Sequence, residues 1–537
     1  MPGSGTVRDD GGVSMDNPQE STQESTHESA QESAQESAGN PSRRWLFLAG
    51  ALTGLAGIAT SQAATALLRQ ETSPVVAVAE VVRDRTPGSI AVPLIHLVQQ
   101  LDKPLLVAGT ALGLVALAGF AGVQSVRRRW LSYVVLTVMA LVALLAVMTR
   151  ANAGPVAFIP LAVGFGTWVV VLGWLTAPQI ESGDRRAFLQ RAGLAAVGTV
   201  VVVGLGEWVG RGRKRVEQAR QLLRLTASPG TVPSGADLGV SKFQPWRTSA
   251  RHFYQIHTAI SLPAITPDQW QLRIHGMVDK PLTLTYDDLV RRQLTEEWVT
   301  LCCVSNFVGG SLIGNAFWSG VLVRDLLAEA GVQPGADAVK QTSQDGWNCG
   351  TPLSALTDPN RQAMLAIAMN GKPLPIEHGF PVRMVVPGLY GYVSATKWLV
   401  DLEVTKFSNF SAYWTERGWS EKGPVKTESR IDVPTDGQEM RPGTQRFGGS
   451  AWAQHTGISK VEFQLDGGQW QEAELGSVPG DDTWVQWAGT AKLAKGGHVV
   501  MVRATDKSGY TQTSVKHETV PNGATGWHTV KFNAGFD

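Results

Sequence analysis

Hydrophobic and polar positions divide the chain into three parts with different patterns. Residues 1–42 are polar, and a Gln-Glu-Ser-Thr/Ala repeat runs from Gln19 to Ala38. A segment with so little apolar surface to bury stays unfolded, so we predict a disordered tail over residues 1–42. Long apolar stretches follow over residues 43–215, and shorter apolar runs separated by Gly-rich and Pro-rich turns fill the chain after about residue 247.

The long apolar stretches predict membrane-spanning helices. Each is close to the ~20 residues that a helix needs to cross a bilayer. Tyr133–Met148 and Pro155–Leu175 contain no charged residue. The alternative is a set of buried helices in a soluble domain. We predict a five-span transmembrane region over residues 43–215, with spans at about residues 45–68, 104–123, 130–149, 155–176 and 192–210.

Basic residues between the apolar stretches predict how the chain is oriented. Cytoplasmic loops are rich in Lys and Arg, which would place Arg43, Arg127–Arg129 and Arg185–Arg191 inside and the C-terminal half outside. The cluster Arg211–Arg215 after the fifth stretch contradicts this simple scheme. Asp184–Leu189 resembles a twin-arginine export signal, a route that carries folded proteins, although its two arginines can also be ordinary juxtamembrane residues. We predict a multi-pass cell-membrane protein in contact with lipid, with its C-terminal half on the extracytoplasmic side.

The C-terminal half predicts a linker and two folded domains. Pro, Gly and Ser are frequent from about residue 225 to residue 246, and we predict a linker over residues 216–246. Strand-like Gln271–Ile274 and helix-like Val321–Ala330 typify residues 247–425, so an α+β domain is expected there. Residues 426–537 have period-two alternation, as in Val461–Leu465 before the turn sequence Asp466-Gly467-Gly468 and in Val499–Ala504. This pattern predicts an immunoglobulin-like β-sandwich without the usual disulfide, suited to interaction or to forming a homodimer.

Charge and cysteine content narrow the function classes. The chain has 47 Lys and Arg against 46 Asp and Glu, which argues against a nucleic-acid partner. Its three cysteines, Cys302, Cys303 and Cys349, are too few for a disulfide framework, although one disulfide from Cys302 or Cys303 to Cys349 stays open. A thiolate is a strong ligand for a transition metal, and Cys303 is followed downstream by cationic residues that suit an anionic metal cofactor.

The motifs of the C-terminal half resemble the sulfite oxidase family of molybdopterin enzymes, which includes the periplasmic methionine sulfoxide reductase catalytic subunits. The resemblance covers about residues 250–537. In order along the chain, the motifs are Thr300–Asn306 (Thr-Leu-x-Cys-x-x-Asn), Gly314–Val321, Met369–Pro375, His378–Arg383 (His-Gly-Phe-Pro-Val-Arg) and Lys397-Trp398.

This resemblance implies a molybdenum–molybdopterin cofactor and assigns residues to it. Cys303 is the one protein ligand of the metal and the catalytic residue. Arg383 offers a forked donor to the pterin phosphate, with His378 and Lys397 beside it. The other expected cofactor-binding residues are Tyr254, Gln255, His257, Asp345 and Thr396. Some of these positions also have ordinary interpretations: Cys303 as a small buried residue, His257 and His378 as core histidines, Arg383 as a surface charge and Asp345 as a turn residue.

Departures from the family pattern bear on the substrate. Sulfite-oxidising members have arginines where this chain has Gln255 and Val308, and a tyrosine where it has Trp419. Those groups hold a small dianion, so sulfite is a poor candidate substrate. The resemblance implies two-electron oxygen-atom transfer on a small molecule, and an S-oxide or N-oxide fits these neutral side chains better.

An electron partner is expected outside this chain. The sequence has no Cys-x-x-Cys-His motif, and its membrane part contains one histidine, His96, so a haem with two histidine ligands cannot form there. We therefore expect a separate electron-transfer partner. A second hypothesis is a membrane-anchored binding or sensing protein that keeps the fold without catalysis.

Overall fold

The structure, a computed structural model, describes residues 43–68, 70, 72–86, 102–150, 155–177, 185–209 and 212–535. Three features discussed above lie outside the described residues: the predicted disordered tail, His96, and Asp184 of the predicted export signal. The chain forms two compact units. One comprises Met1–Asp84, Val98–Met148 and Pro155–Gly210, and the other comprises Arg85–Leu97, Thr149–Gly154 and Arg211–Asp537.

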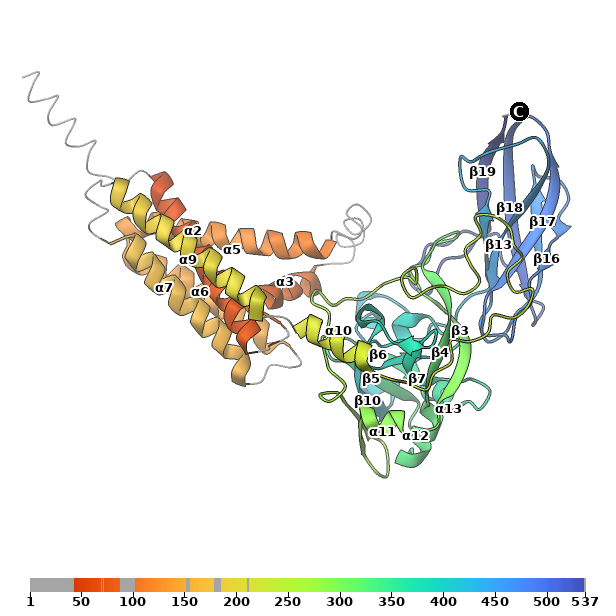
Figure 1. Ribbon diagram of the computed structural model, residues 1–537, viewed down its shortest axis with the longest axis horizontal. Coiled ribbons are helices and arrows are strands. Elements are labelled where there is room, and N and C mark those ends of the chain that lie inside the picture. The colour runs from red at the N-terminus through yellow and green to blue at the C-terminus, as the bar shows by residue number, and fades with distance from the viewer. Residues whose placement is uncertain are drawn as a thin grey trace, which may run out of the picture. The chain divides into compact units, whose positions relative to one another are not determined.

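The first unit is built from helices (Figure 1). They are α2 (Arg43–Leu67), α3 (Pro74–Arg85), α5 (Asp102–Arg127), α6 (Arg129–Met148), the short η2 (Pro155–Phe158), α7 (Ile159–Leu175) and α9 (Arg185–Val209). Helix α2 packs against α5, α7 and α9. Its glycines permit this closeness, since a Cβ added at Gly50 would lie 2.1 Å from the carbonyl oxygen of Ala118 on α5. Small residues at such contacts are typical of membrane helices.

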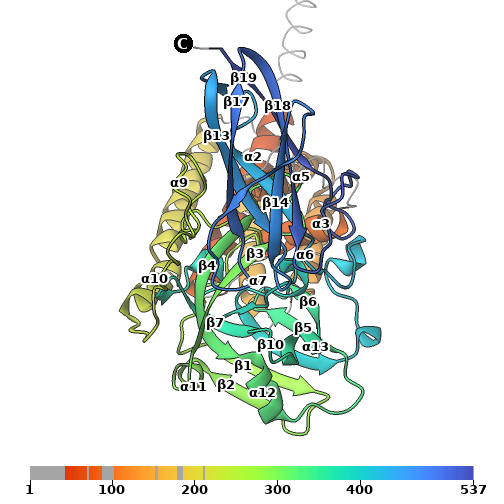
Figure 2. The ribbon, with the colours of Figure 1, turned by 90° about the vertical axis from the view of Figure 1, so that its right-hand side faces the viewer.

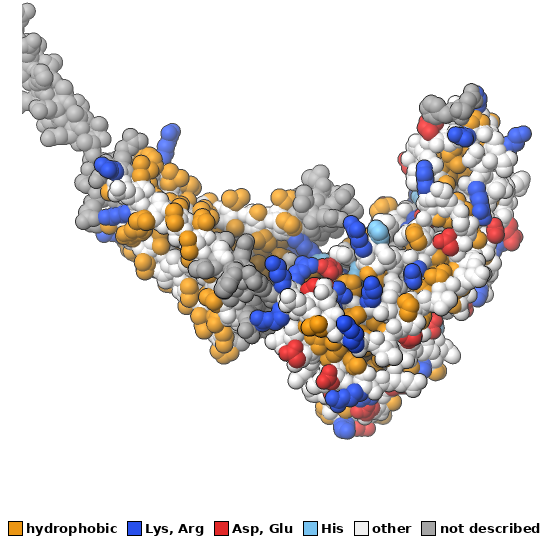
Figure 3. All heavy atoms as spheres, viewed as in Figure 1, with side chains coloured by type: hydrophobic (Ala, Val, Ile, Leu, Met, Phe, Trp, Pro, Cys, Tyr) orange, Lys and Arg blue, Asp and Glu red, His pale blue; other side chains and the backbone are white. Residues whose placement is uncertain are grey.

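Four helical segments of the described residues are long and apolar enough to cross a membrane. They are Arg43–Leu67, Lys103–Val126, Arg129–Met148 and Pro155–Leu175. Many of their Leu and Val side chains face outward, and Figure 3 shows apolar side chains over much of the visible face of these helices. The fifth predicted span forms α9 but is not among these four, so its membrane crossing stays a prediction.

One mixed sheet and one antiparallel sheet form the first half of the second unit. One has the order β2-β1-β10-β5-β6, in which β1 and β10 run parallel, and the other has the order β3-β4-β7-β8 with β9 paired to β7. Their bounds are β1 Gln271–Gly276, β2 Leu282–Thr285, β3 Thr295–Cys302, β4 Ile313–Leu322, β5 Ala338–Ser343, β6 Asn348–Pro352, β7 Met364–Met369, β8 Lys372–Pro373, β9 Arg383–Val385 and β10 Leu399–Thr405.

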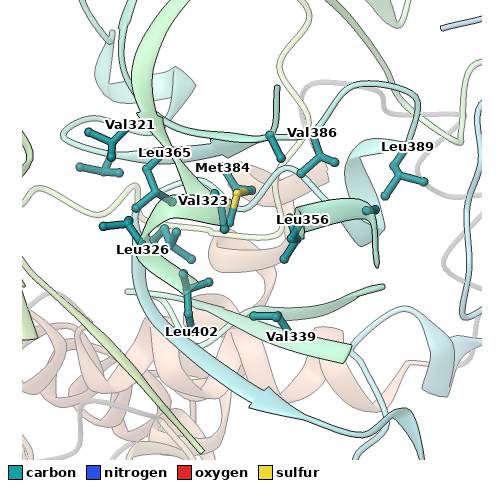
Figure 4. Packing of buried hydrophobic residues seen from close by; sticks show 14 of the residues in the cluster. Val321, Val323, Leu326, Val339, Leu356, Leu365, Met384, Val386, Leu389 and Leu402 are labelled. Atoms are coloured by element: carbon teal, nitrogen blue, oxygen red, sulfur yellow. The ribbon is translucent and has the colours of Figure 1, made fainter. Parts of the chain in front are cut away.

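Short helices join these strands, which confirms the predicted α+β class. The α-helices are α11 (Tyr286–Val290), α12 (Val323–Ala330) and α13 (Leu353–Thr357), and the 3-10 helices are η3 (Ile376–His378), η4 (Gly391–Val393), η5 (Phe407–Asn409) and η6 (Thr415–Arg417). Helix α12 starts two residues after the predicted Val321, because Val321 and Leu322 still pair with β7. Apolar side chains from α12, β7 and β9 meet in one core, where Val323, Leu365 and Met384 lie together (Figure 4).

The segment before these sheets is more ordered than a flexible linker. Helix α10 spans Gly212–Leu222, and its Val216 is buried in a core with Phe253 and Ile376. Residues 223–246 have no helix or strand, yet Ala236 and Trp246 are fully buried in the main core. The Pro-rich and Gly-rich composition of this segment therefore gives an irregular backbone that still packs against the domain.

The C-terminal strands form two packed sheets, as the alternation predicted (Figure 2). Their orders are β11-β13-β17-β16 and β12-β19-β18-β14-β15. Asp466 and Gly467 have positive φ angles in the predicted hairpin turn between β14 and β15. The immunoglobulin type stays a prediction. The strands are β11 Glu428–Val433, β12 Glu439–Met440, β13 Gly443–Trp452, β14 Ile458–Leu465, β15 Gln471–Glu472, β16 Glu474–Leu475, β17 Val485–Leu493, β18 Gly496–Asp506 and β19 His528–Ala534.

We predict that Phe463→Ala destabilises the sandwich by about 3–5 kcal/mol, because it removes a fully buried ring from a close-packed core. The Phe463 ring is stacked between Phe447 and Trp487, with centroids 5.9 Å and 6.1 Å away. Urea unfolding followed by tryptophan fluorescence measures the change. Tyr510→Ala, at a half-exposed position, is the control and should change stability by less than about 0.5 kcal/mol. Equal effects of the two substitutions would contradict the packing described.

Candidate functional site

Cys303 is the first residue after β3 and begins a closed loop that leads to β4. Its backbone N–H donates to the carbonyl oxygen of Leu312 at 2.9 Å, and its carbonyl accepts from the N–H of Asn306 at 3.0 Å. The side-chain oxygen of Asn306 accepts from the N–H of Leu312 at 2.8 Å. Asn306 of the sequence motif therefore closes the loop that presents the cysteine.

Polar groups surround the Cys303 thiol, which is 8% exposed. Burial raises the pKa of this thiol, whereas hydrogen bonds from the Ser305 N–H and hydroxyl and the charge of Lys397 act in the opposite direction. Groups that favour the charged sulfur are those that a metal-binding thiolate needs. The assignment of Cys303 as the metal ligand stays a prediction.

Arg383 is a buried cation without a carboxylate partner. It lies on β9, is 3% exposed, and directs its guanidinium at the carbonyl oxygens of Met384, His378 and Ala395 over 3.3–3.4 Å. None of the ion pairs among residues 212–535 involves it. Burial lowers the pKa of Arg383 to about 10, which still leaves it charged at neutral pH. A buried charge of this kind is costly without a counter-ion, so the site suits an anion.

His378 and Lys397 lie beside this guanidinium. The His378 Nε2 atom donates to the carbonyl oxygen of Ala250 at 2.7 Å, and its buried Nδ1 atom has no hydrogen-bond partner within the described residues. Burial, together with the charges of Lys397 and Arg383, lowers the pKa of His378 to about 4. The Lys397 ammonium donates to the carbonyl oxygen of Glu377 at 3.0 Å.

A glycine brings these cations together. Gly379 has a φ of +105°, and a Cβ added there would lie 2.9 Å from the Cβ of Lys397 and 3.1 Å from that of Arg383. The His-Gly-Phe-Pro sequence contained this signal, because a glycine between two candidate ligands indicates a close approach of the backbone.

The three predicted cofactor-binding residues of the segment around Tyr254 have different surroundings. The Tyr254 ring stacks on Phe253 with centroids 5.2 Å apart, and burial and the neighbouring Cys303 raise its pKa well above the usual value. The His257 ring meets Trp398 edge-on at 5.9 Å. The side chain of Gln255 is exposed, and the structure brings it to no described site residue.

Asp345 and Thr396 lie at the edge of the same region. The Asp345 carboxylate accepts from the Trp347 N–H at 3.4 Å within its own turn, and the neighbouring Gln344 N–H donates to the Trp398 carbonyl at 2.9 Å. The Thr396 hydroxyl contacts the Cys349 sulfur at 3.3 Å. All three cysteines are free thiols, so the disulfide that the sequence left open does not form.

Some functional side chains were not singled out by sequence reasoning. Ser305 holds the Cys303 sulfur, and Phe253 packs on both Tyr254 and His378. Trp318 offers its ring to the Arg383 guanidinium, with 5.1 Å from Cζ to the ring centroid. Ser305 and Trp318 stand inside the quoted motifs, but only folding reveals which group each one touches.

Comparisons with known proteins agree with this geometry. Residues 259–414 match the family described as "Oxidoreductase molybdopterin binding domain". "Uncharacterized oxidoreductase YuiH" of Bacillus subtilis is 36% identical over 155 residues, which cover 29% of this chain and 74% of that protein. The chain belongs to the sulfite oxidase family of molybdopterin oxidoreductases.

Other proteins are similar over longer stretches of the chain. Mitochondrial sulfite oxidase of Rattus norvegicus is 30% identical over 260 residues, covering 40% of this chain and 47% of that protein. Sulfite oxidase of Arabidopsis thaliana is 29% identical over 328 residues, covering 50% and 83% respectively. The sulfane dehydrogenase SoxCD of Paracoccus pantotrophus covers 55% of this chain and 85% of that chain, with 23% identity and a TM-score of 0.48. The chain thus spans about half the length of the mammalian sulfite oxidases that it matches.

The family implies a molybdopterin cofactor, and the described residues of this sulfite oxidase family member fit it. The phosphate is an anion, and Arg383 is a buried cation with only carbonyl partners. The buried Nδ1 atom of His378 has an unused hydrogen-bonding position. Cys303 supplies a soft sulfur held by donors.

We predict that His378→Gln reduces the acid sensitivity of the cofactor-free protein. The unfolded histidine binds a proton near pH 6.5 and the folded one near pH 4, so the stability contributed by the neutral ring is lost as pH falls through this window. The glutamine does not titrate and can still donate to Ala250. Between pH 7 and pH 4.5 the variant should lose about 2–3 kcal/mol less stability than the wild type.

Urea unfolding at several pH values measures this difference. His528, whose pKa is also lowered to about 4 by burial, contributes equally to both proteins and cancels. Parallel stability curves for the variant and the wild type would show that His378 is not the titrating group.

Proposed function

We propose that this protein is a membrane-anchored, extracytoplasmic molybdenum oxidoreductase that carries out two-electron oxygen-atom transfer on a small substrate. The observation that carries the proposal is the pairing of a donor-held sulfur at Cys303 with the buried, carboxylate-free guanidinium of Arg383. A protein that only anchored or bound a partner would gain nothing from burying that charge, which costs stability unless an anion joins it.

The residues have distinct roles in this proposal. Cys303 binds the metal, and Ser305 orients its sulfur by donating two hydrogen bonds. Arg383 binds the phosphate of the cofactor, and Lys397 adds a second positive charge. His378 stays neutral, so its Nδ1 atom accepts a hydrogen bond rather than adding charge. The cofactor supplies the oxygen-atom and electron transfer, so no side chain needs to act as a nucleophile.

The remaining expected residues take supporting roles. Tyr254 and His257 cover the cofactor from the segment before β1, with Phe253 and Trp398 fixing their rings. The Thr396 hydroxyl contacts the Cys349 sulfur, and the Asp345 carboxylate holds its own turn by accepting from the Trp347 N–H. Gln255 is exposed, and we assign it to the substrate side of the site.

The substrate is neutral or larger than sulfite. Trp419 contacts Tyr392 in a tilted arrangement, with ring centroids 5.8 Å apart. Trp419 thus offers an aromatic surface at the position where sulfite-oxidising relatives have a tyrosine. Such a surface favours an S-oxide or N-oxide with an apolar group over a small dianion.

Membrane anchoring and an external electron partner complete the proposal. The four apolar helices support anchoring in the lipid bilayer. The export signal resembled by Asp184–Leu189 supports placement of the folded domain outside the cytoplasm. Electrons come from a separate redox protein or small carrier. Formation of a homodimer through the sandwich stays part of the proposal.

We predict about one molybdenum atom per chain when the full-length protein is purified from a host that makes molybdopterin. Cys303→Ser should abolish activity, because a serine hydroxyl is a hard oxygen ligand in place of a soft sulfur. Elemental analysis by mass spectrometry gives the metal content. Cys349→Ser, at a buried thiol that contacts Thr396 instead, is the matched control and should keep the metal. Absence of molybdenum from the wild type would favour the binding or sensing hypothesis.

We further predict that an organic S-oxide or N-oxide reoxidises the chemically reduced, molybdenum-loaded protein faster than sulfite reduces the oxidised one. The physical reason is that Gln255, Val308 and Trp419 replace the two arginines and the tyrosine that hold a small dianion in sulfite-oxidising relatives. Stopped-flow absorbance under anaerobic conditions measures both rates. Rapid reduction by sulfite would overturn this assignment of substrate class while leaving the family unchanged.

A further inference from the structure

Strand β3, which leads to Cys303, has one edge covered by the C-terminal sandwich rather than by a strand. In its sheet β3 pairs only with β4. On the other edge the Thr300 N–H donates to the Asp482 carbonyl at 2.9 Å, and the Thr300 carbonyl accepts from Gln454 Nε2 at 3.1 Å. An uncovered edge would leave these backbone groups without partners, so the sandwich completes the strand.

The side chain of Thr300 is held by the same domain. Its hydroxyl accepts from the Trp484 N–H at 2.8 Å and donates to the Asn315 side chain at 3.0 Å. Trp484 is in turn fixed by a reciprocal pair of hydrogen bonds with Trp246, at 2.9 Å and 3.1 Å. The contacts of Thr300 therefore hold the chain three positions before Cys303.

The far end of the cysteine loop is held as well. Arg430 on β11 donates to the Gly310 carbonyl at 2.9 Å, and its remaining nitrogens bind Asp432 and Gln244. Gly309 lies against the imidazole of His528 on β19, where an added Cβ would come within 2.2 Å of the ring nitrogen. The sandwich therefore contacts the chain on both sides of residues 303–308.

We propose that Gln454 and Arg430 of the C-terminal sandwich are positioning residues for the metal-binding cysteine: they fix the two ends of the Cys303 loop so that the sulfur meets the metal at a constant geometry. The proposal rests on the proposed function, since it takes Cys303 as the ligand. The sandwich is then part of the active site's support, in addition to any role in forming a dimer. Loop ligands need such a rigid frame, because small displacements change metal coordination.

Gln454→Met tests the proposal, since methionine fills a similar volume and cannot donate. Gln512→Met is the matched control: Gln512 is similarly buried in the sandwich, and its side-chain hydrogen bonds go to Ser429, Ala504 and Gly526, none of which belongs to the Cys303 loop. Amide hydrogen exchange of residues 301–312 is followed by mass spectrometry in the full-length chain, purified without cofactor. Gln454→Met should speed this exchange about five- to tenfold, as expected for loss of one buried hydrogen bond, and Gln512→Met should not.

A spectroscopic measurement separates positioning from general stability. In molybdenum-loaded protein the thiolate-to-metal absorption band should shift in Gln454→Met and stay unchanged in Gln512→Met, even where the two variants unfold at the same urea concentration. If Gln454→Met does not fold, Thr300→Val replaces it, and Thr300→Ser, which keeps the hydroxyl, should restore slow exchange. Unchanged exchange in Gln454→Met, or an equal increase in Gln512→Met, overturns the proposal. Because exchange is measured without cofactor, a failure of the proposed function appears separately, as a wild type without molybdenum.

Discussion

A buried positive charge without a negative partner is the constraint on which the site depends. Arg383 sits on a short strand between apolar layers and meets only carbonyl oxygens at long hydrogen-bonding distance. Lys397 and the depressed pKa of His378 belong to the same electrostatic situation, since burial and then the charges of Lys397 and Arg383 lower that pKa. A buried cation of this kind opposes folding unless an anion binds, so an anionic cofactor would stabilise the folded state.

The sulfur at Cys303 stands at the other end of that region, and its environment differs from that of the neighbouring thiols. Burial is the largest influence on all three thiols and raises the pKa of each. The Thr396 and Thr351 side chains oppose this rise at Cys349, whereas Ser305 and the charge of Lys397 oppose it at Cys303. Cys302 ends β3 and is buried in the main core, and Cys303 is the next residue along the chain.

The α+β part and the sandwich part of the second unit are linked through strand β3. Backbone groups of Thr300 that β4 cannot reach are satisfied by Gln454 and Asp482 of the sandwich region, and the Trp484 N–H donates to the Thr300 hydroxyl. A β-sandwich appended to an enzyme domain is readily interpreted as an interaction module, and the sequence supported that interpretation. The contacts also give the sandwich a structural role near Cys303, because strand β3, which leads to Cys303, is completed by residues about 150 positions further along the chain.

The sequence by itself predicted the class of each part. Apolar length predicted the long apolar helices, period-two alternation predicted the sandwich strands, and the order of the motifs indicated Cys303, His378, Arg383 and Lys397 as candidate site residues, because these signals are local in the chain. Tertiary structure alone decided which polar groups meet. It paired Thr300 with Gln454, left Gln255 exposed, engaged Thr396 with Cys349, and packed the Gly-rich segment before residue 246 into a core. The physical reason is that hydrogen-bond partners and burial depend on contacts between residues far apart in sequence, which no local pattern records.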